Sequence, residues 1–397
     1  MKILEMIEEG KENCVGCSAC CNVCPKNAIS MKPDIEGFLY PIIEKKLCVD
    51  CGICEEVCPM LQEKSNIKDA EKTIKAFAFC SKNDEERWLS SSGGVFSILS
   101  RYVLLRGGVV FGAAFDEFWG VHHISIKSVT DLSKLRGAKY VQSRIENTYK
   151  QAKDELSKGK LVLFSGTPCQ VEGLNAYIGA RMDNLILVDM ICHGVPSPLI
   201  WNKYLDWKKR TGDIVAITFR KKNISWEKYS LEFDYMNSYQ EAMLSNKDPY
   251  MKGFLQDLYL RPSCYCCSFK KRNRQSDFTI ADFWGIDEVV PKMNDHKGTS
   301  LVILHTDKAA GIFSQIEGEK CEVSFEKAIR SNPAMLESVG KNINRDIFFV
   351  SVLQGHDCIE KILRRYTTPS FWKRAYFFCR YIAGTIKNFI WKKSNKL

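Results

Sequence analysis

Short apolar runs alternate with segments of helical periodicity over most of the chain. Runs rich in β-branched and aromatic residues predict strands at residues 73–80, 109–115, 122–129, 160–164, 185–190, 214–220, 230–235, 278–281 and 300–305. Helical spacing of apolar residues predicts helices at residues 146–158 and 198–209, and a loop that enters a helix at residues 90–106. The runs 160–164 and 185–190 are continuously apolar, as strands inside a mostly parallel sheet are. The alternation predicts a mixed α/β body.

The two ends of the chain differ from this body in composition. Residues 64–75 are polar and charged and are typical of a linker. We therefore expect an N-terminal domain in residues 1–65, a body with a first part in residues 66–155 and a second part in residues 156–355, and a C-terminal tail in residues 356–397.

Eight of the eighteen cysteines form a duplicated pattern near the N-terminus. Each half reads C-x2-C-x2-C-x3-C-P, and each cysteine of the second half lies 34 positions after its counterpart. The eight are Cys14, Cys17, Cys20 and Cys24 in the first half and Cys48, Cys51, Cys54 and Cys58 in the second. This spacing is typical of bacterial ferredoxin domains that hold two [4Fe–4S] clusters.

In such domains the fourth cysteine of each half binds the other cluster. We therefore expect one cluster on Cys14, Cys17, Cys20 and Cys58, and the other on Cys48, Cys51, Cys54 and Cys24. Gly16 and Gly52 supply permissive backbone where amides approach the sulfides. A zinc ribbon, which also uses C-x2-C pairs, is the alternative.

Four further cysteines are predicted to meet in the body. Cys169 follows the strand at 160–164 and Cys192 follows the strand at 185–190, and ligands of α/β sheets gather at such strand ends. Cys264 and Cys267 form a C-x2-C pair. Together the four predict a third [4Fe–4S] cluster. A zinc site and unmetallated buried thiols are the alternatives.

Polar loops near these strand ends are candidates for cofactor binding and catalysis. A serine–glycine loop precedes the helix at 90–106, where backbone amides favour an anion such as a phosphate, although a serine-capped helix fits equally well. His193, beside Cys192, is a weak catalytic candidate because the pKa of histidine lies near neutrality, and a structural histidine is the alternative. The candidate cofactor-binding residues of these loops are Ser91, Ser92, Gly93, Gly94, Gly166 and Thr167.

Ordered segments of the body resemble the β-subunit of the F420-reducing hydrogenases and its relatives. They are SSSGGVFS (90–97), RGAKYVQS (136–143), FSGTPCQVEGL (164–174), DMICHGVPSP (189–198), FRKKNISW (219–226), RPSCYCCSFK (261–270) and DFTIADFWGI (277–286). The resemblance covers roughly residues 75–310. Members of this family bind FAD and an iron–sulfur cluster, and the best-known ones exchange a hydride with the deazaflavin coenzyme F420.

The resemblance implies flavin contacts from the serine–glycine loop and from Lys139 and Tyr140. It implies cluster ligation by Cys264 and Cys267, while Cys266 departs from the pattern and competes with Cys267 as the ligand. The expected fold class is α+β, with an N-terminal 2[4Fe–4S] ferredoxin-like domain, a mixed α/β flavin-binding body and a basic C-terminal helix.

The cysteines and the resemblance together indicate an FAD- and iron–sulfur-dependent oxidoreductase. It would pass electrons between its clusters and a small-molecule hydride acceptor such as coenzyme F420, with a redox protein as partner, either a ferredoxin or a hydrogenase or dehydrogenase subunit. The alternative is an electron-transfer subunit of a larger hydrogenase or dehydrogenase complex, without a substrate site of its own.

The charge of the chain is concentrated in the tail. There are 57 Lys and Arg against 47 Asp and Glu, a net charge of +10, and ten basic but no acidic residues lie between Lys361 and Leu397. The rest of the chain is balanced, which argues against nucleic-acid binding. No apolar stretch is long enough to span a membrane and no secretory signal is present, so we expect a cytoplasmic protein.

The tail itself is predicted to form an amphipathic helix after Pro369. Aromatic and aliphatic residues such as Phe371, Phe378 and Ile382 fall opposite basic residues such as Lys373 on this helix. This pattern is typical of a helix that makes peripheral contact with the anionic inner face of the membrane. A helix that packs on the body or on an acidic partner is the alternative.

Overall fold

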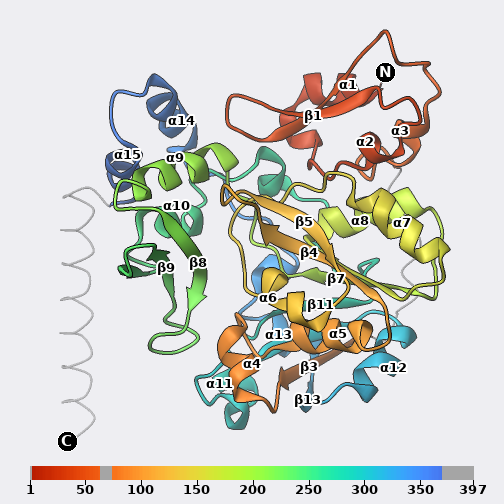
Figure 1. Cartoon of the computed structure of the whole chain (residues 1–397), viewed down its shortest axis with the longest axis vertical. Helices are drawn as coiled ribbons and strands as arrows, with labels where there is room; N and C mark the ends of the chain where they lie inside the picture. Colours follow the sequence, from red (N-terminus) through yellow and green to blue (C-terminus); the bar gives the residue numbers. More distant parts are fainter. Residues whose placement is uncertain (1, 63–73, 369–397) are drawn as a thin grey trace, which may run out of the picture.

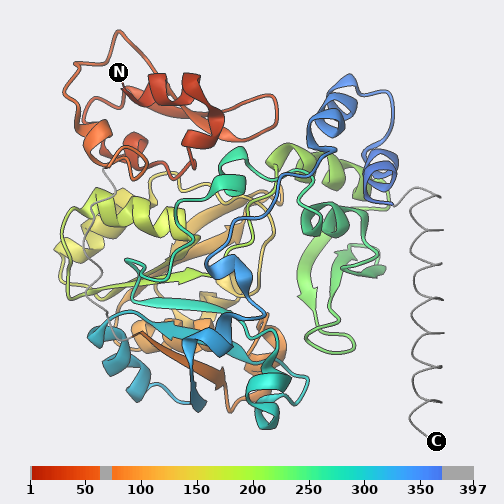
Figure 2. The same cartoon turned by 180° about the vertical axis from the view of Figure 1, so that it is seen from behind.

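The computed structural model describes residues 2–62 and 74–368. Figures 1 and 2 show the N-terminal domain at one end of a large central sheet, with a smaller sheet beside it. The predicted linker falls almost entirely outside the described residues, as does the predicted helix after Pro369.

A mixed sheet of eight strands forms the centre of the body, in the order β13-β3-β12-β11-β7-β6-β4-β5. The strands are β3 (Lys75–Cys80), β4 (Val109–Phe115), β5 (Val121–Ile126), β6 (Val162–Gly166), β7 (Leu185–Met190), β11 (Phe278–Asp282), β12 (Ser300–Leu304) and β13 (Glu319–Val323). Neighbouring strands among β4, β6, β7 and β11 run parallel, and the strands outside them pair antiparallel. The predicted mixed α/β body is confirmed.

Helices cover both faces of this sheet, which explains the continuously apolar strands. Leu163 of β6 packs on one face, with α5 (Val95–Leu104), α6 (Leu132–Leu135) and α12 (Asp307–Gln315). Val162 and Phe164 pack on the other face, with α7 (Thr148–Ser157) and α8 (Pro168–Ile178). At the β13 end lie α4 (Asp84–Leu89), α11 (Ile286–Val289) and α13 (Phe325–Ile329).

A second, antiparallel sheet packs beside the large one. It contains β8 (Ile214–Lys221), β9 (Ser230–Tyr235) and β10 (Gln240–Leu244) in the order β10-β9-β8. Its aromatic core includes α9 (Pro198–Lys208), α10 (Pro249–Leu255), α14 (Arg345–Gln354) and α15 (Ile359–Thr367). The first stretch of the predicted tail therefore packs on the body through α15. In the part of the chain that the structure describes, no helix has the length and hydropathy to cross a membrane.

The N-terminal domain contains three short helices and one hairpin. They are α1 (Lys2–Glu9), α2 (Ala19–Val23), α3 (Ile53–Glu56), and the antiparallel strands β1 (Ile29–Pro33) and β2 (Leu39–Ile43). Polar contacts join this domain to the body: Asn22 Nδ2 donates to the carbonyl of Glu146 at 2.8 Å, and Glu36 pairs with the buried Arg345. The domain thus lies against α7 and α8, at the edge of the sheet where the candidate site is found.

Candidate iron-sulfur and cofactor sites

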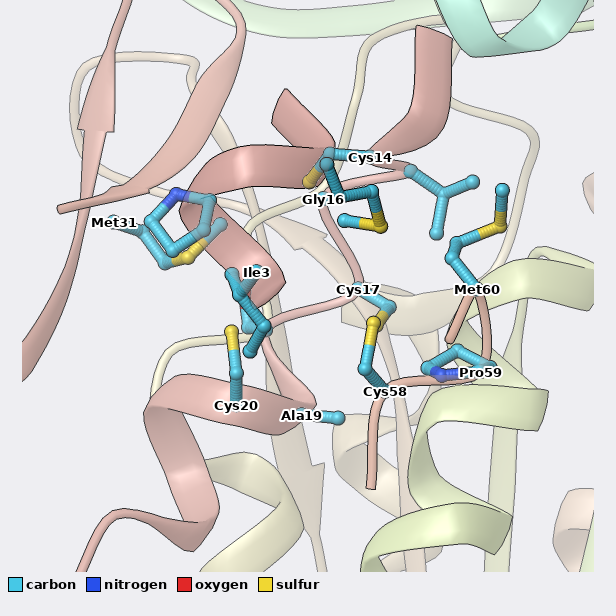
Figure 3. Close-up of a pocket in the computed structure, with 14 residues that line it drawn as sticks. Ile3, Cys14, Gly16, Cys17, Ala19, Cys20, Met31, Cys58, Pro59 and Met60 are labelled. Carbon is cyan, nitrogen blue, oxygen red and sulfur yellow. The ribbon is translucent and has the colours of Figure 1, made fainter. Parts of the chain in front are cut away.

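One hollow in the N-terminal domain is lined by four cysteines. This inner quartet consists of Cys14, Cys17, Cys20 and Cys58 (Figure 3). Apolar side chains, including Ile3, Met31 and Met60, form the walls around the sulfur atoms. The inner quartet is the ligand set that the sequence predicts for the first cluster, three cysteines from one half of the duplication and the fourth from the other.

A second hollow is lined by the other four cysteines of the duplication. This outer quartet consists of Cys24, Cys48, Cys51 and Cys54. Cys51 is exposed, and so are its neighbours Asp50 and Val49. The structure thus brings together both predicted N-terminal quartets.

The electrostatics of the inner quartet fit a metal cluster. Burial raises the pKa of Cys17 well above its ordinary value, and the neighbouring thiols of Cys58 and Cys14 raise it further. Four thiols in such surroundings become thiolates when metal ions bind, because a metal deprotonates a coordinating thiol outright. The apolar walls then keep water away from the sulfur atoms.

Cys169, Cys192, Cys264 and Cys267, the body quartet, also come together. The thiols of Cys169 and Cys264 raise the pKa of Cys192, after the larger effect of burial. Burial raises the pKa of Cys169 to about 12 and that of Cys264 to about 11. Cys266 is exposed, whereas the thiol of Cys267 is among those that raise the pKa of Cys169 and Cys192, so the geometry favours Cys267 over Cys266 as the fourth member.

Local structure holds the body quartet in place. Cys169 lies in the first turn of α8, where Thr167 Oγ1 is 3.2 Å from its Sγ atom. The amide of Val195 donates to Cys264 Sγ at 3.4 Å, and the amide of Cys267 donates to Ser338 Oγ at 2.9 Å. Hydrogen bonds to the sulfur atoms are a means by which proteins tune cluster potentials.

The inner quartet and the body quartet are neighbours. Gly173 of α8 lies directly against Cys17, since a Cβ atom at Gly173 would be 2.9 Å from Cys17 Cβ and 3.0 Å from Cys17 Sγ. Cys17 is also within electrostatic range of Cys169. Three groups of cysteines therefore follow one another from the outer quartet, where Cys51 is exposed, through the inner quartet to the body.

The inner and outer quartets each line a hollow, an arrangement that fits the four corner irons of a cubane cluster.

The segments predicted to contact a flavin also meet, around the buried Arg220. Its guanidinium nitrogens donate to Tyr140 Oη and to the carbonyl of Ser91, each at 3.4 Å, and one lies 2.8 Å from Asp282 Oδ2. The amide of Ala138 donates to Ser91 Oγ at 2.8 Å. Lys139 donates only weakly, to backbone carbonyls at 3.2–3.4 Å, and burial lowers its pKa to about 7.

Other residues of the candidate cofactor site have structural partners. Ser92 Oγ donates to the carbonyl of Thr299 at 2.7 Å. A Cβ atom at Gly93 would be 2.3 Å from the carbonyl oxygen of Phe79, and Gly94 has a φ of 90° at the start of α5. The small size of Gly93 is therefore explained by its approach to β3. Its substitution by valine, as a test of phosphate binding, would also disturb the sheet.

The remaining candidates lie at the start of α8 and near α10. Thr167 caps α8 and shares a capping box with Gln170, while Gly166 lies next to His123. His193 Nε2 is 2.7 Å from Asp257 Oδ1, and its ring packs edge-on against Phe254 at 5.1 Å. The catalytic role of His193 stays a prediction.

Sequence reasoning missed Arg261, whose side chain is fully buried against the inner quartet. Its Nε atom donates to the carbonyl of Cys14 at 2.9 Å, and one of its terminal nitrogens lies 3.7 Å from Cys14 Sγ. Only its position three residues before Cys264 could have drawn attention to it.

The described site agrees with the known families that the chain matches. Residues 13–61 match the family described as 4Fe-4S dicluster domain. Residues 159–327 match the family described as the C terminus of the coenzyme F420 hydrogenase/dehydrogenase beta subunit. No curated protein matches the chain. A chain of the F420-reducing [NiFe] hydrogenase complex from Methanosarcina barkeri is similar, with 14% identity, a TM-score of 0.45, and coverage of 76% of this chain and 92% of that one.

The dicluster domain and its paired quartets define an iron–sulfur electron-transfer protein. More particularly, residues 159–327, which follow this domain in the chain, are similar to the C terminus of the coenzyme F420 hydrogenase/dehydrogenase beta subunit. The predicted family resemblance is confirmed.

Proposed function

We propose that the chain is an iron–sulfur flavoprotein oxidoreductase with three [4Fe–4S] clusters and one FAD. Iron–sulfur clusters exchange single electrons, and a flavin converts these into a two-electron hydride transfer. The inner, outer and body quartets would each hold one cluster. The observation that carries the proposal is the direct packing of Gly173, beside Cys169, on Cys17, which offers a short route from the N-terminal domain into the body.

Residues around Arg220 are the best candidates to hold the FAD. Ser91, Lys139 and Tyr140 come from separate segments and meet there. Lys139 has only carbonyl oxygens as hydrogen-bond partners among the described residues, so a phosphate group would complement its ammonium. Gly166 and Thr167 would border the same site, because the charge of Lys139 reaches His123, which hydrogen-bonds to Ser165 at 2.9 Å.

We propose a small-molecule hydride acceptor such as coenzyme F420, and a redox protein as the partner that exchanges electrons at the outer quartet, where Cys51 is exposed. The family of residues 159–327 supports a subunit partner in a larger complex as well. In that second candidate function the chain relays electrons to the partner and has no substrate site of its own.

Anaerobic purification with quantification of iron, sulfide and flavin tests the proposal. We expect about twelve irons and one FAD per chain, four irons for each cubane. Reduction of F420 or another hydride acceptor by the isolated chain, with dithionite as the electron source, favours the oxidoreductase. Cluster reduction without any acceptor turnover favours the relay subunit, and a protein without iron contradicts both.

A further inference from the structure

Arg261 is a buried cation that no carboxylate neutralises in the part of the chain that the structure describes. Its side chain is fully buried, and its nitrogens donate to the carbonyls of Cys14 and Leu39 at 2.9 and 3.1 Å and to Gln142 Oε1 at 3.4 Å. The guanidinium also lies 4.3 Å above the ring of Tyr40. Each of these partners is uncharged.

Two acidic residues whose charges act on Tyr40, the ring under this guanidinium, already have basic partners. Asp34 pairs with Lys11 at 2.5 Å, and Glu36 pairs with Arg345. Other buried arginines of the chain pair with a carboxylate. Arg274, for example, lies 3.0 Å from Asp189. A buried charge is costly unless an opposite charge compensates it, so the position of Arg261 needs an explanation.

The position of Arg261 between two cysteine quartets supplies that explanation. Its side chain reaches the inner quartet, where one terminal nitrogen is 3.7 Å from Cys14 Sγ. Its backbone contacts the body quartet, since the carbonyl of Arg261 accepts a hydrogen bond from the amide of Cys264 at 2.9 Å. Gly16 makes this approach feasible, because a Cβ atom there would be 2.9 Å from a terminal nitrogen of Arg261.

We propose that Arg261 is the shared counter-charge of the inner cluster and the body cluster, and that it sets their reduction potentials. This inference rests on the proposed function, because it requires clusters on both quartets. A cubane with four thiolate ligands is anionic, and reduction adds one further negative charge. A fixed cation nearby stabilises the reduced form more than the oxidised form, so it raises the potential. Arg261 is thus a positioning residue that also links the N-terminal domain to the body.

Redox titration with dithionite, followed by electron paramagnetic resonance, tests this role in the anaerobically purified full chain. In Arg261→Gln we expect the potential of the inner cluster, and less strongly that of the body cluster, to fall. A shift of tenfold or more in the ratio of oxidised to reduced cluster at fixed potential corresponds to about 59 mV or more. Arg261→Lys, which keeps the charge, should restore most of the potential, and the outer cluster serves as an internal reference.

Gln142→Glu tests the same role without removal of Arg261. It places a carboxylate near the guanidinium with little change in volume, so it should lower the potential of the inner cluster in the same direction. This variant still tests the effect of Arg261 on the potential if Arg261→Gln loses its clusters. Arg345→Gln is the matched control, because Arg345 also joins the two regions but pairs with Glu36.

Three results would overturn the inference. One is an unchanged inner-cluster potential in Gln142→Glu with the clusters intact. Another is an equal shift in Arg345→Gln, and the third is an equal shift of the outer cluster. A wild-type chain that holds no iron after reconstitution would instead refute the proposed function itself, and iron analysis separates that failure from the others.

Discussion

The inner and outer quartets are built from duplicated halves, yet they occupy different surroundings. Val15, beside the inner quartet, is 6% exposed, whereas its counterpart Val49 is 58% exposed. Cys17 is buried, whereas its counterpart Cys51 is exposed. The duplicated cysteine pattern therefore determines the ligands of each cluster, and contact with the body determines which of the two clusters is buried.

The backbone of the two halves confirms that the binding loops are equivalent. Gly16 and its counterpart Asp50 have φ values of 69° and 49°, and Ser18 and its counterpart Gly52 have φ values of 62° and 75°. Gly16 and Gly52 were predicted to supply permissive backbone, and both have positive φ. The same conformation at Asp50 and Ser18 shows that the spacing of the cysteines, more than the glycines, dictates the turns.

The largest expected effect is a difference in how much the two quartets stabilise the chain. Cys17→Ala and Cys51→Ala should each remove one cluster, about four irons per chain. Cys17→Ala should also lower the melting temperature far more, because the inner cluster lies between the domain and α8, whereas Cys51 is exposed. Iron analysis and anaerobic thermal unfolding measure both quantities. Equal losses of stability would show that burial does not distinguish the quartets.

A substitution in α8, on the body side, can disturb the contact between the inner quartet and the body. Gly173→Ala should destabilise the chain by about 1–3 kcal/mol, because the new Cβ atom overpacks against Cys17. It should also slow electron transfer from the N-terminal domain to the body, as measured by stopped-flow reduction.

Gly311 of α12 provides the control for Gly173. A Cβ atom there meets nothing within 4 Å among the described residues, so Gly311→Ala should be neutral or stabilise by up to about 1 kcal/mol. If the two variants are equally stable in urea unfolding, the packing of α8 on Cys17 is looser than described.

Lys139 is a half-buried cation whose charge depends on pH. Burial lowers the pKa of Lys139 to about 7. Between pH 7 and 10 the unliganded chain therefore holds Lys139 mostly neutral, and a bound phosphate would raise its pKa and draw in a proton. We expect FAD affinity to fall as pH rises through this window, and the fall to be much smaller in Lys139→Met. Titration calorimetry in buffers with different ionisation enthalpies measures the proton uptake, and its absence would place the FAD phosphates elsewhere.

The smallest expected effect concerns the tail beyond residue 368. Its basic and apolar faces predict binding to anionic vesicles, worth about 1 kcal/mol for each basic residue near the surface. A chain truncated after Thr368 should co-sediment less than the full chain, and salt should weaken the full chain's binding. Equal sedimentation of both chains would favour the alternative, in which the tail packs on the body or on an acidic partner.

The quartets could be predicted from the sequence because their determinants are local. The spacing within each half and the strand ends before Cys169 and Cys192 specify where the sulfur atoms lie. Strands β10 and β13 were missed because they are short and largely polar. Arg261 could not be found in this way, since its partner Cys14 lies 247 positions away. The serine–glycine loop was ambiguous for a different reason, because glycine also permits the close approach of Gly93 to Phe79.

The central claim is that the body quartet holds a third cluster next to the inner one. Iron and sulfide analysis of the reconstituted wild type and of Cys264→Ala tests it most directly, with Cys266→Ala as the matched control. We predict about twelve irons for the wild type and for Cys266→Ala, and about eight for Cys264→Ala. Eight irons in all three proteins would contradict the claim.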